Sequence, residues 1–245
     1  MDHAAEWYPA GHKVLIKELN CSFFAGGPMT YKALFFDFDY TLGSRDVYAY
    51  QLYLRAVNEN SSIDDPVLKE AIVQDCMIWD QKGNESKYYV QDLLKERYGI
   101  ELKYDDFSVW WDDHLWEYSC AYDDAYDTVS KLKEKGYLIG MLSNGTSEGQ
   151  RLKLRNAGLE DLFDAIAVSQ DIGFKKPDVR LFEHAMKLLN VTPEESVMVG
   201  DIYGRDILGA YRAGMRPVWF CVEPNMPHHA DITVIHALKE LLEYF

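Results

Sequence analysis

The chain has 245 residues, of which 48% are hydrophobic and 14% aromatic, enough to fill the core of one α/β domain with a modest insertion. Its net charge of -15, from 25 basic and 40 acidic residues, makes nucleic acid and anionic membranes poor partners for the surface as a whole. The chain contains no run of 18 apolar residues that could span a membrane. We therefore expect a cytoplasmic protein, monomeric or homodimeric, that binds neither nucleic acid nor membrane.

The N-terminal 28 residues lack the basic start and unbroken apolar stretch of a secretory signal, because Lys17 and Glu18 interrupt Val14 to Ile16. We expect residues 1–28 to be an extension, or upstream sequence, that is peripheral to any active site. The four cysteines form no CxxC pair and have no metal-ligand spacing, so free thiols in a reducing compartment are expected; they are Cys21, Cys76, Cys120 and Cys221.

The first predicted strand ends on two acidic residues. Ala33 to Phe36 has the apolar and aromatic content of a buried strand, and Asp37 and Asp39 follow it directly. In open α/β sheets, ligands bind at the carboxyl edge, where both acids would lie. Two carboxylates there need compensation, which a divalent cation can supply. An ordinary acidic turn is the alternative for this short pattern.

Between Leu42 and Ala121 the apolar residues follow a helical period, without a convincing strand. Asn and Gly clusters divide this stretch into four predicted helices, at about 46–58, 66–79, 86–98 and 105–118. Its aromatic residues have helical spacing, which is more typical of a core than of a substrate contact; they are Trp79, Trp110, Trp111 and Trp116, with His114 beside them.

After Tyr122, strand and helix patterns alternate, with strands near 137–142, 165–168, 197–200 and 217–221. Repeated β-α units imply a parallel sheet with helices on both faces. Three further segments place polar groups after apolar runs or in loops. They are Ser143-Asn144-Gly145, the loop Lys175-Lys176-Pro177, and Gly200-Asp201 followed by Asp206.

These four segments, in this order, resemble the motifs of the haloacid dehalogenase (HAD) superfamily: DxDx(T/V), a Ser or Thr at the second strand end, a Lys, and GDx(3-4)D. The resemblance covers about 31–245 and is closest to the nucleotidase and phosphoglycolate-phosphatase-like branches. It implies an α/β fold, a Rossmann-like core made of 29–44 and 121–245. A helical cap of C1 type, formed by four helices, would be inserted at 45–120.

The resemblance also implies roles for the motif acids. Asp37 would be the nucleophile and a metal ligand, since an ionised carboxylate needs no base at neutral pH. Asp39 would protonate the leaving alcohol and then activate water, with its backbone carbonyl reaching the metal. Asp201 would ligate the metal directly, and Asp206 would act through water or hold the lysine. An oxygen-only set with few protein ligands suits Mg²⁺.

For the phosphoryl group, the resemblance implies binding by Ser143, the backbone amides of Asn144 and Gly145, and Lys176. Lys175 is interpreted as a solvated side chain. For Thr41, a role in orienting the loop and a structural role remain equally open.

For three further side chains, a functional role has a structural or surface role as its alternative. Arg45 could meet an acidic substrate or form an exposed hinge salt bridge. His228 and His229 are interpreted as a surface pair, because no third metal ligand is in view.

The expected function is a Mg²⁺-dependent phosphatase of a small phosphorylated metabolite, such as a nucleoside monophosphate or a phosphoglycolate-like ester. A phosphomutase shares Asp37 and Asp39 and stays an alternative. A 2-haloacid dehalogenase is disfavoured by Asp39, because a halide leaving group needs no proton. A noncatalytic binding protein is disfavoured by the complete set of acid, hydroxyl and lysine.

Overall fold

The structure is a computed structural model that describes residues 31–223 and 225–245. The predicted N-terminal extension, residues 1–28, lies outside the described residues. No helix in the described part of the chain is long and apolar enough to cross a membrane.

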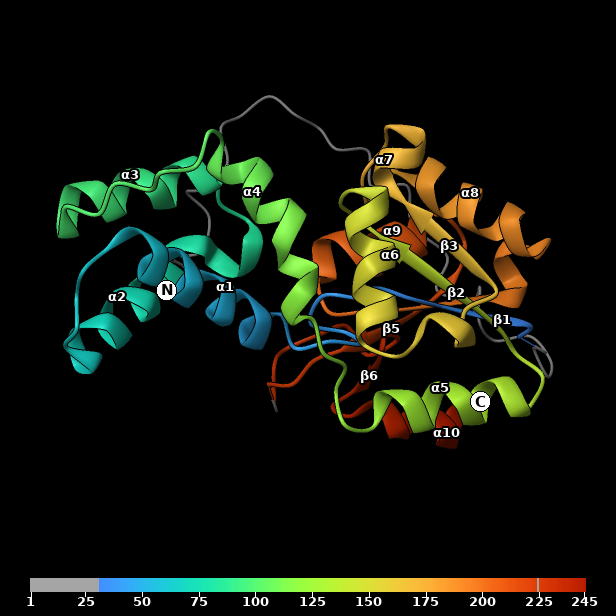
Figure 1. Cartoon of the computed structure of the whole chain (residues 1–245). Coiled ribbons are helices and arrows are strands. Elements are labelled where there is room, and N and C mark those ends of the chain that lie inside the picture. The colour runs from blue at the N-terminus through green and yellow to red at the C-terminus, as the bar shows by residue number, and fades with distance from the viewer. Residues whose placement is uncertain (1–30, 224) are drawn as a thin grey trace, which may run out of the picture. The chain divides into compact units, whose positions relative to one another are not determined.

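Six parallel strands form one sheet in the order β3-β2-β1-β4-β5-β6 (Figure 1). Their bounds are β1 Ala33–Phe36, β2 Leu138–Ser143, β3 Ala165–Val168, β4 Ser196–Gly200, β5 Arg216–Phe220 and β6 Thr233–Ile235. The sheet confirms the predicted fold class, and β6 was not predicted because its three residues are too few for a periodic pattern. The strand order reverses at β1, between β2 and β4, which is where open α/β sheets bind ligands.

Helices cover both faces of the sheet because side chains alternate along each strand. In β1, Ala33 and Phe35 pack in a core with residues of α8 and α9, whereas Leu34 and Phe36 pack in a core with residues of α5, α6 and α10. The helices of this part are α5 Ala125–Glu134, α6 Ser147–Asn156, α7 Ser169–Ile172, α8 Val179–Leu189, α9 Leu208–Arg212 and α10 Leu241–Tyr244. Short 3₁₀ turns cover Glu160–Leu162, Pro193–Glu195 and Leu238–Glu240, and a π-helical turn, η5, covers Tyr203–Ile207.

Four helices follow β1, as predicted, and we call them the cap helices (Figure 1). They are α1 Arg45–Asn60, α2 Pro66–Asp80, α3 Lys87–Tyr98 and α4 Phe107–His114, with 3₁₀ turns η1 at Gln81–Gly83 and η2 at Leu115–Tyr118. Asp65, Ser86 and Asp106 cap the N-termini of α2, α3 and α4 by accepting hydrogen bonds from backbone N–H groups.

The chain enters and leaves the cap helices through two segments that lie side by side. Gly43 pairs with Ala121 in an antiparallel bridge, and the N–H of Tyr122 donates to the carbonyl of Leu42 at 2.8 Å. A Cβ atom at Gly43 would lie 2.6 Å from the carbonyl oxygen of Cys120, so only glycine allows this close approach. The exact division of the chain into a core and a cap at 44/45 and 120/121 stays a prediction.

A buried charge cluster holds the end of α2. Asp80 is 1% exposed and accepts hydrogen bonds from Arg45 at 2.6 Å and Tyr53 at 2.9 Å, and it also pairs with Lys87. Burial, aided by the charge of Arg45, lowers the pKa of Lys87 to about 7. The prediction of an exposed hinge salt bridge for Arg45 is therefore wrong: the ion pair is buried, because α2 turns back over the start of α1.

We predict that Asp80→Ala destabilises the fold by about 3–5 kcal/mol, because it leaves Arg45 buried without its counter-charge. In a chain of this size, thermal unfolding should move down by roughly 10 °C. The matched control is Gln74→Ala on the exposed face of the same helix, which should change the melting temperature by no more than about 2 °C. Equal melting temperatures for the two variants would show that the cluster contributes no net stability.

Candidate functional site

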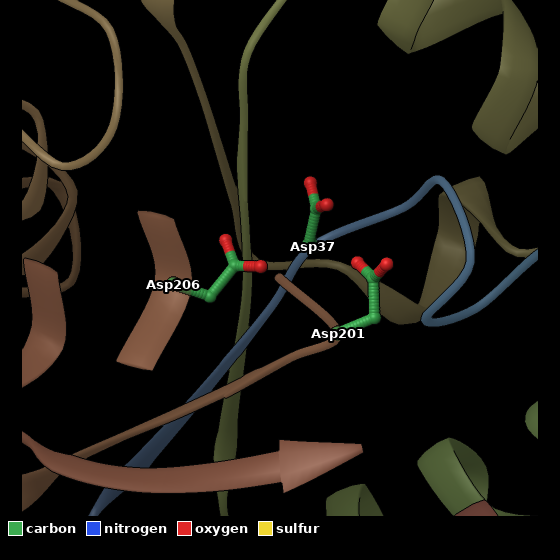
Figure 2. A group of neighbouring side chains, drawn as sticks. All are labelled: Asp37, Asp201 and Asp206. Atoms are coloured by element: carbon green, nitrogen blue, oxygen red, sulfur yellow. The ribbon is translucent and has the colours of Figure 1, made fainter. Parts of the chain in front are cut away.

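Three aspartates from two neighbouring strands converge at the carboxyl edge of the sheet (Figure 2). Asp37 directly follows β1, Asp201 directly follows β4, and Asp206 lies in η5. One carboxylate oxygen from each lies within 4.8 Å of the others, a spacing that a single cation can bridge. Gly200 makes this possible, because a Cβ atom there would lie 2.4 Å from Cβ and Cγ of Asp206.

Lys176 provides the positive charge within this cluster. Its Nζ lies 2.8 Å from Oδ1 of Asp37 and 2.7 Å from Oδ1 of Asp206, and it donates to the carbonyl of Leu142 at 2.9 Å. Although burial opposes the charged form, Asp206 and Asp37 raise the pKa of Lys176 above its ordinary value. The ammonium group therefore stays charged, but one cation cannot neutralise three carboxylates.

The electrostatics of the cluster show this deficit. Burial, together with the charges of Asp37 and Asp206, raises the pKa of Asp201 to about 8. Burial also raises the pKa of Asp206, although Lys176 opposes the shift. Two carboxyls with raised pKa values beside a third, with oxygen as the only donor atom, fit a hard divalent cation. These three aspartates could thus hold a metal ion, and their role as ligands of Mg²⁺ stays a prediction.

Neighbouring groups orient Asp201 from two sides. The indole Nε1 of Trp219, on β5, donates to its backbone carbonyl at 2.7 Å. The hydroxyl of Thr41 lies 3.5 Å from Oδ1 of Asp201 and is fully buried. Thr41 therefore contacts the acidic cluster, in line with the orienting role considered for it.

The second predicted motif also reaches Asp37. Ser143, the last residue of β2, donates its hydroxyl to Oδ1 of Asp37 at 2.7 Å. Asn144 holds the lysine loop instead, since its Oδ1 accepts from the N–H of Lys176 at 2.7 Å. The N–H of Gly145 donates to the hydroxyl of Ser169 at 3.0 Å, so in this structure that amide is not free for the predicted phosphate contact.

Asp39 lies apart from the three-aspartate cluster and is held by residues that the sequence interpretation missed. Lys153, on α6, donates to both of its carboxylate oxygens at 2.8 Å, and the hydroxyl of Tyr48, on α1, donates to Oδ1. Burial raises the pKa of Asp39, but Lys153 and then Arg45 outweigh it, so the net pKa is lowered. The sequence signal for Lys153 is its helical spacing from Gln150 and Leu154, with which it shares the buried face of α6.

A cavity of about 810 Å³ joins these groups. Core and cap side chains both line it, including Asp37, Asp39, Ser143 and Lys176 from the motifs and Asp112 and Trp116 from the cap. Lys175 also lines it, and its side chain is exposed, as expected for a solvated lysine. Its size and its polar wall suit a small polar metabolite rather than a macromolecule.

The predicted aromatic and histidine residues divide between core and surface. Trp79 and Trp111 are buried, as expected for core residues, and Trp110 stacks on Tyr104 and His114. Trp116 differs, because it lines the cavity. His228 and His229 are exposed, and neither takes part in a metal-compatible cluster of the described residues, in agreement with a surface pair.

We predict that Mg²⁺ raises the melting temperature more at pH 8.5 than at pH 6. In the metal-free folded protein, burial raises the pKa of Asp201 to about 8, well above the ordinary value of an aspartate. The folded state therefore holds a proton that the unfolded chain releases, and the metal-free protein loses stability as pH rises through this window. Thermal unfolding with Mg²⁺ or with EDTA at both pH values measures the effect.

Asp201→Asn is the matched control. It removes the group that titrates, and with it the negative charge that this side chain offers to the metal. Its melting temperature should respond to Mg²⁺ more weakly than that of the wild type, with a smaller difference between the two pH values. A wild-type response to Mg²⁺ that does not change with pH, or that Asp201→Asn retains in full, would contradict the assignment.

Comparisons with known proteins give one consistent family. The family model described as haloacid dehalogenase-like hydrolase matches residues 31–214. A glyceraldehyde 3-phosphate phosphatase from Methanothermobacter thermautotrophicus is 31% identical over 222 residues, covering 86% of this chain and 98% of the relative. A phosphoserine phosphatase from Thermus thermophilus is 40% identical over 98 residues, 40% of this chain and 39% of the relative.

Among solved structures, a HAD-hydrolase from Bacillus subtilis, determined with bound magnesium, is 26% identical with a TM-score of 0.68. The match covers 88% of this chain and 98% of that one. A HAD phosphatase from Thermococcus onnurineus is also 26% identical, with a TM-score of 0.60 over 87% of this chain and 97% of that one.

Proposed function

The chain belongs to the haloacid dehalogenase-like hydrolases, and we propose that it is a Mg²⁺-dependent phosphatase that hydrolyses a small phosphorylated metabolite through an aspartyl-phosphate. Its relatives include enzymes named as phosphatases of glyceraldehyde 3-phosphate and phosphoserine, which supports a phosphomonoester substrate. The observation that carries the proposal is the convergence of Asp37, Asp201 and Asp206 around Lys176 beside one cavity.

Asp37 is the proposed nucleophile. Ser143 and Lys176 both contact its Oδ1, which fixes the carboxylate, while no described residue donates a hydrogen bond to Oδ2. An oxygen of this carboxylate attacks phosphorus, and the bond between phosphorus and the leaving alcohol oxygen breaks. The positive charge of Lys176 stabilises the charge that develops on the phosphoryl oxygens.

Asp39 is the proposed acid and base. Because its lowered pKa leaves it ionised, Asp39 first takes up the proton that a phosphate ester monoanion brings. It gives this proton to the leaving alcohol oxygen as the aspartyl-phosphate forms, and it then takes a proton from the water that attacks phosphorus. The second step releases inorganic phosphate and restores the Asp37 carboxylate. Asp39 lines the cavity and is bound by Lys153 and Tyr48, which hold its carboxylate in one orientation.

Asp37, Asp201 and Asp206, with the backbone carbonyl of Asp39, would hold Mg²⁺. When bound, the ion would neutralise charge on the carboxylates and on the phosphoryl oxygens. The proposed phosphate-binding groups are Ser143, Lys176 and the backbone amide of Asn144, with Gly145 contributing only if its contact with Ser169 opens.

The cysteines of the described part are unpaired, which supports the inferred cytoplasmic location. We also propose that the protein is a monomer or a homodimer.

We predict that Asp37→Asn abolishes phosphate release from p-nitrophenyl phosphate, lowering kcat by at least about 10³-fold, because the amide is not a nucleophile. The measurement is colorimetric turnover, with circular dichroism and the melting temperature to show that the fold is retained. An active Asp37→Asn protein with an unchanged rate would disprove the nucleophile assignment.

Removal of divalent cations should stop turnover, since the carboxylate cluster then lacks its compensating charge. We predict that activity falls to background in EDTA and returns when Mg²⁺ is added in excess. Turnover that persists after exhaustive chelation would exclude the metal role of Asp37 and Asp201.

Lys153→Met tests the acid role of Asp39. Lys153 lowers the pKa of Asp39, so its removal should raise that pKa and move the alkaline decline of kcat/KM for an alkyl phosphate to higher pH. A p-nitrophenyl ester, whose leaving group needs little protonation, serves as the comparison and should show a smaller shift. Identical pH profiles in the wild type and in Lys153→Met would argue against general-acid catalysis by Asp39.

A further inference from the structure

The cavity is lined by more basic side chains than the motif lysine alone. Six basic and four acidic side chains line it, whereas the chain as a whole has a net charge of -15. The basic residues are Arg45, Lys82, Lys153, Lys175, Lys176 and Arg205, and the acidic residues are Asp37, Asp39, Asp112 and Asp206. A local excess of positive charge in an acidic protein indicates an anionic ligand.

Half of these basic residues are already compensated by acids. Lys176 pairs with Asp37 and Asp206, Lys153 pairs with Asp39, and Arg45 pairs with the buried Asp80. The other three, Lys82, Lys175 and Arg205, form no ion pair within residues 31–223 and 225–245. Asp112 does not compensate them either, since the opposing charges that act on it are those of Lys153, Lys87 and Arg45.

Lys82 is presented by a loop that the structure holds in an unusual conformation. Gln81, Lys82 and Gly83 all have positive φ angles, of 45°, 59° and 83°. Positive φ angles are costly for residues other than glycine, and they persist where the surroundings hold them. Here the side chain of Arg45 packs against Gly83, where a Cβ atom would lie 2.6 Å from Cζ of the guanidinium group.

Arg205 comes from the core and contacts the segment that follows the Lys82 loop. It lies in η5, between the two metal-site aspartates in sequence, and its Nη2 donates to Oδ1 of Asn84 at 2.5 Å. Asn84 in turn donates its side-chain amide to the carbonyl of Gln81 at 2.7 Å. Lys82 Nζ lies 5.2 Å from the centre of the Tyr40 ring, which follows the motif acid Asp39. One cation from the cap and one from the core thus border the same part of the cavity.

We propose that Lys82 and Arg205, assisted by Lys175, form a second anion-binding subsite, which selects phosphate monoesters that carry a further anionic group. This inference rests on the proposed phosphatase function and specifies its substrate class. The phosphate to be cleaved lies against Ser143 and Lys176, and the second anion, a carboxylate or another phosphate, lies between the cap loop and η5. Phosphorylated alcohols and sugars that carry no anionic group besides the phosphate lack that contact and are poorer substrates.

The test compares substrates that differ only in the distal charge. 3-Phosphoglycerate and glycerol 3-phosphate share the phosphate ester and three-carbon chain but end in a carboxylate and a hydroxymethyl group. Fructose 1,6-bisphosphate and fructose 1-phosphate provide the same comparison for a second phosphate. We expect the wild type to prefer one or both of the doubly anionic substrates by about tenfold or more in kcat/KM, chiefly through KM.

Four variants locate the source of that preference. Lys82→Gln and Arg205→Gln should each reduce the ratio of the two kcat/KM values several-fold, toward one. Lys82→Arg keeps the charge and should retain most of the ratio. Lys131→Gln, an exposed lysine on α5 outside the cavity, should leave the ratio unchanged.

Three results would contradict the proposed subsite or the proposed function. A wild type that turns over p-nitrophenyl phosphate but shows equal kcat/KM within both substrate pairs would overturn the subsite while leaving the phosphatase function intact. The same holds if Lys82→Gln and Arg205→Gln both keep the wild-type ratio. If purified wild-type protein with Mg²⁺ releases phosphate from none of these esters, the proposed function itself fails, and the substrate class fails with it.

Discussion

The structure depends on the compensation of three carboxylates that meet at the carboxyl edge of a parallel sheet. Asp37, Asp201 and Asp206 lie within bridging distance of one cation, and the buried Lys176 offsets only part of their charge. Burial, together with the charges of Asp37 and Asp206, raises the pKa of Asp201 to about 8. Burying such a cluster costs stability, and in the proposed function a cation and a phosphoryl group would complete the site.

Side chains from the cap helices and from the core helix α6 form a second group of charged and polar contacts around this centre. Lys153 and Tyr48 bind the carboxylate of Asp39, and Arg45 lies between the buried Asp80 and the loop at Gly83. Motif side chains of the core and the loop at Gln81–Gly83 both line the same cavity. In the proposed function, the core would carry out the chemistry and the cap would determine which ester enters.

Several features could be predicted from local sequence because their causes are local. The apolar run Ala33 to Phe36 ends on Asp37, and strands that end on functional residues bring those residues to one edge of a parallel sheet. The helical period between Leu42 and Ala121 likewise predicts the four cap helices. In contrast, β6 is too short for a pattern, and the buried pairing of Arg45 with Asp80 joins residues 35 positions apart.

The order and spacing of the motif residues by themselves determined the fold class, the family and the candidate acids, hydroxyl and lysine. The acids and the hydroxyl lie at or just after the ends of strands whose apolar pattern is local, and the lysine lies in a loop directly before a proline. Only the tertiary structure decided what surrounds them. It showed that Lys153 binds Asp39 across 114 positions and that Arg205 meets Asn84 across 121. Such pairings depend on how distant helices pack, and no local pattern of charges encodes which lysine or arginine faces a cavity.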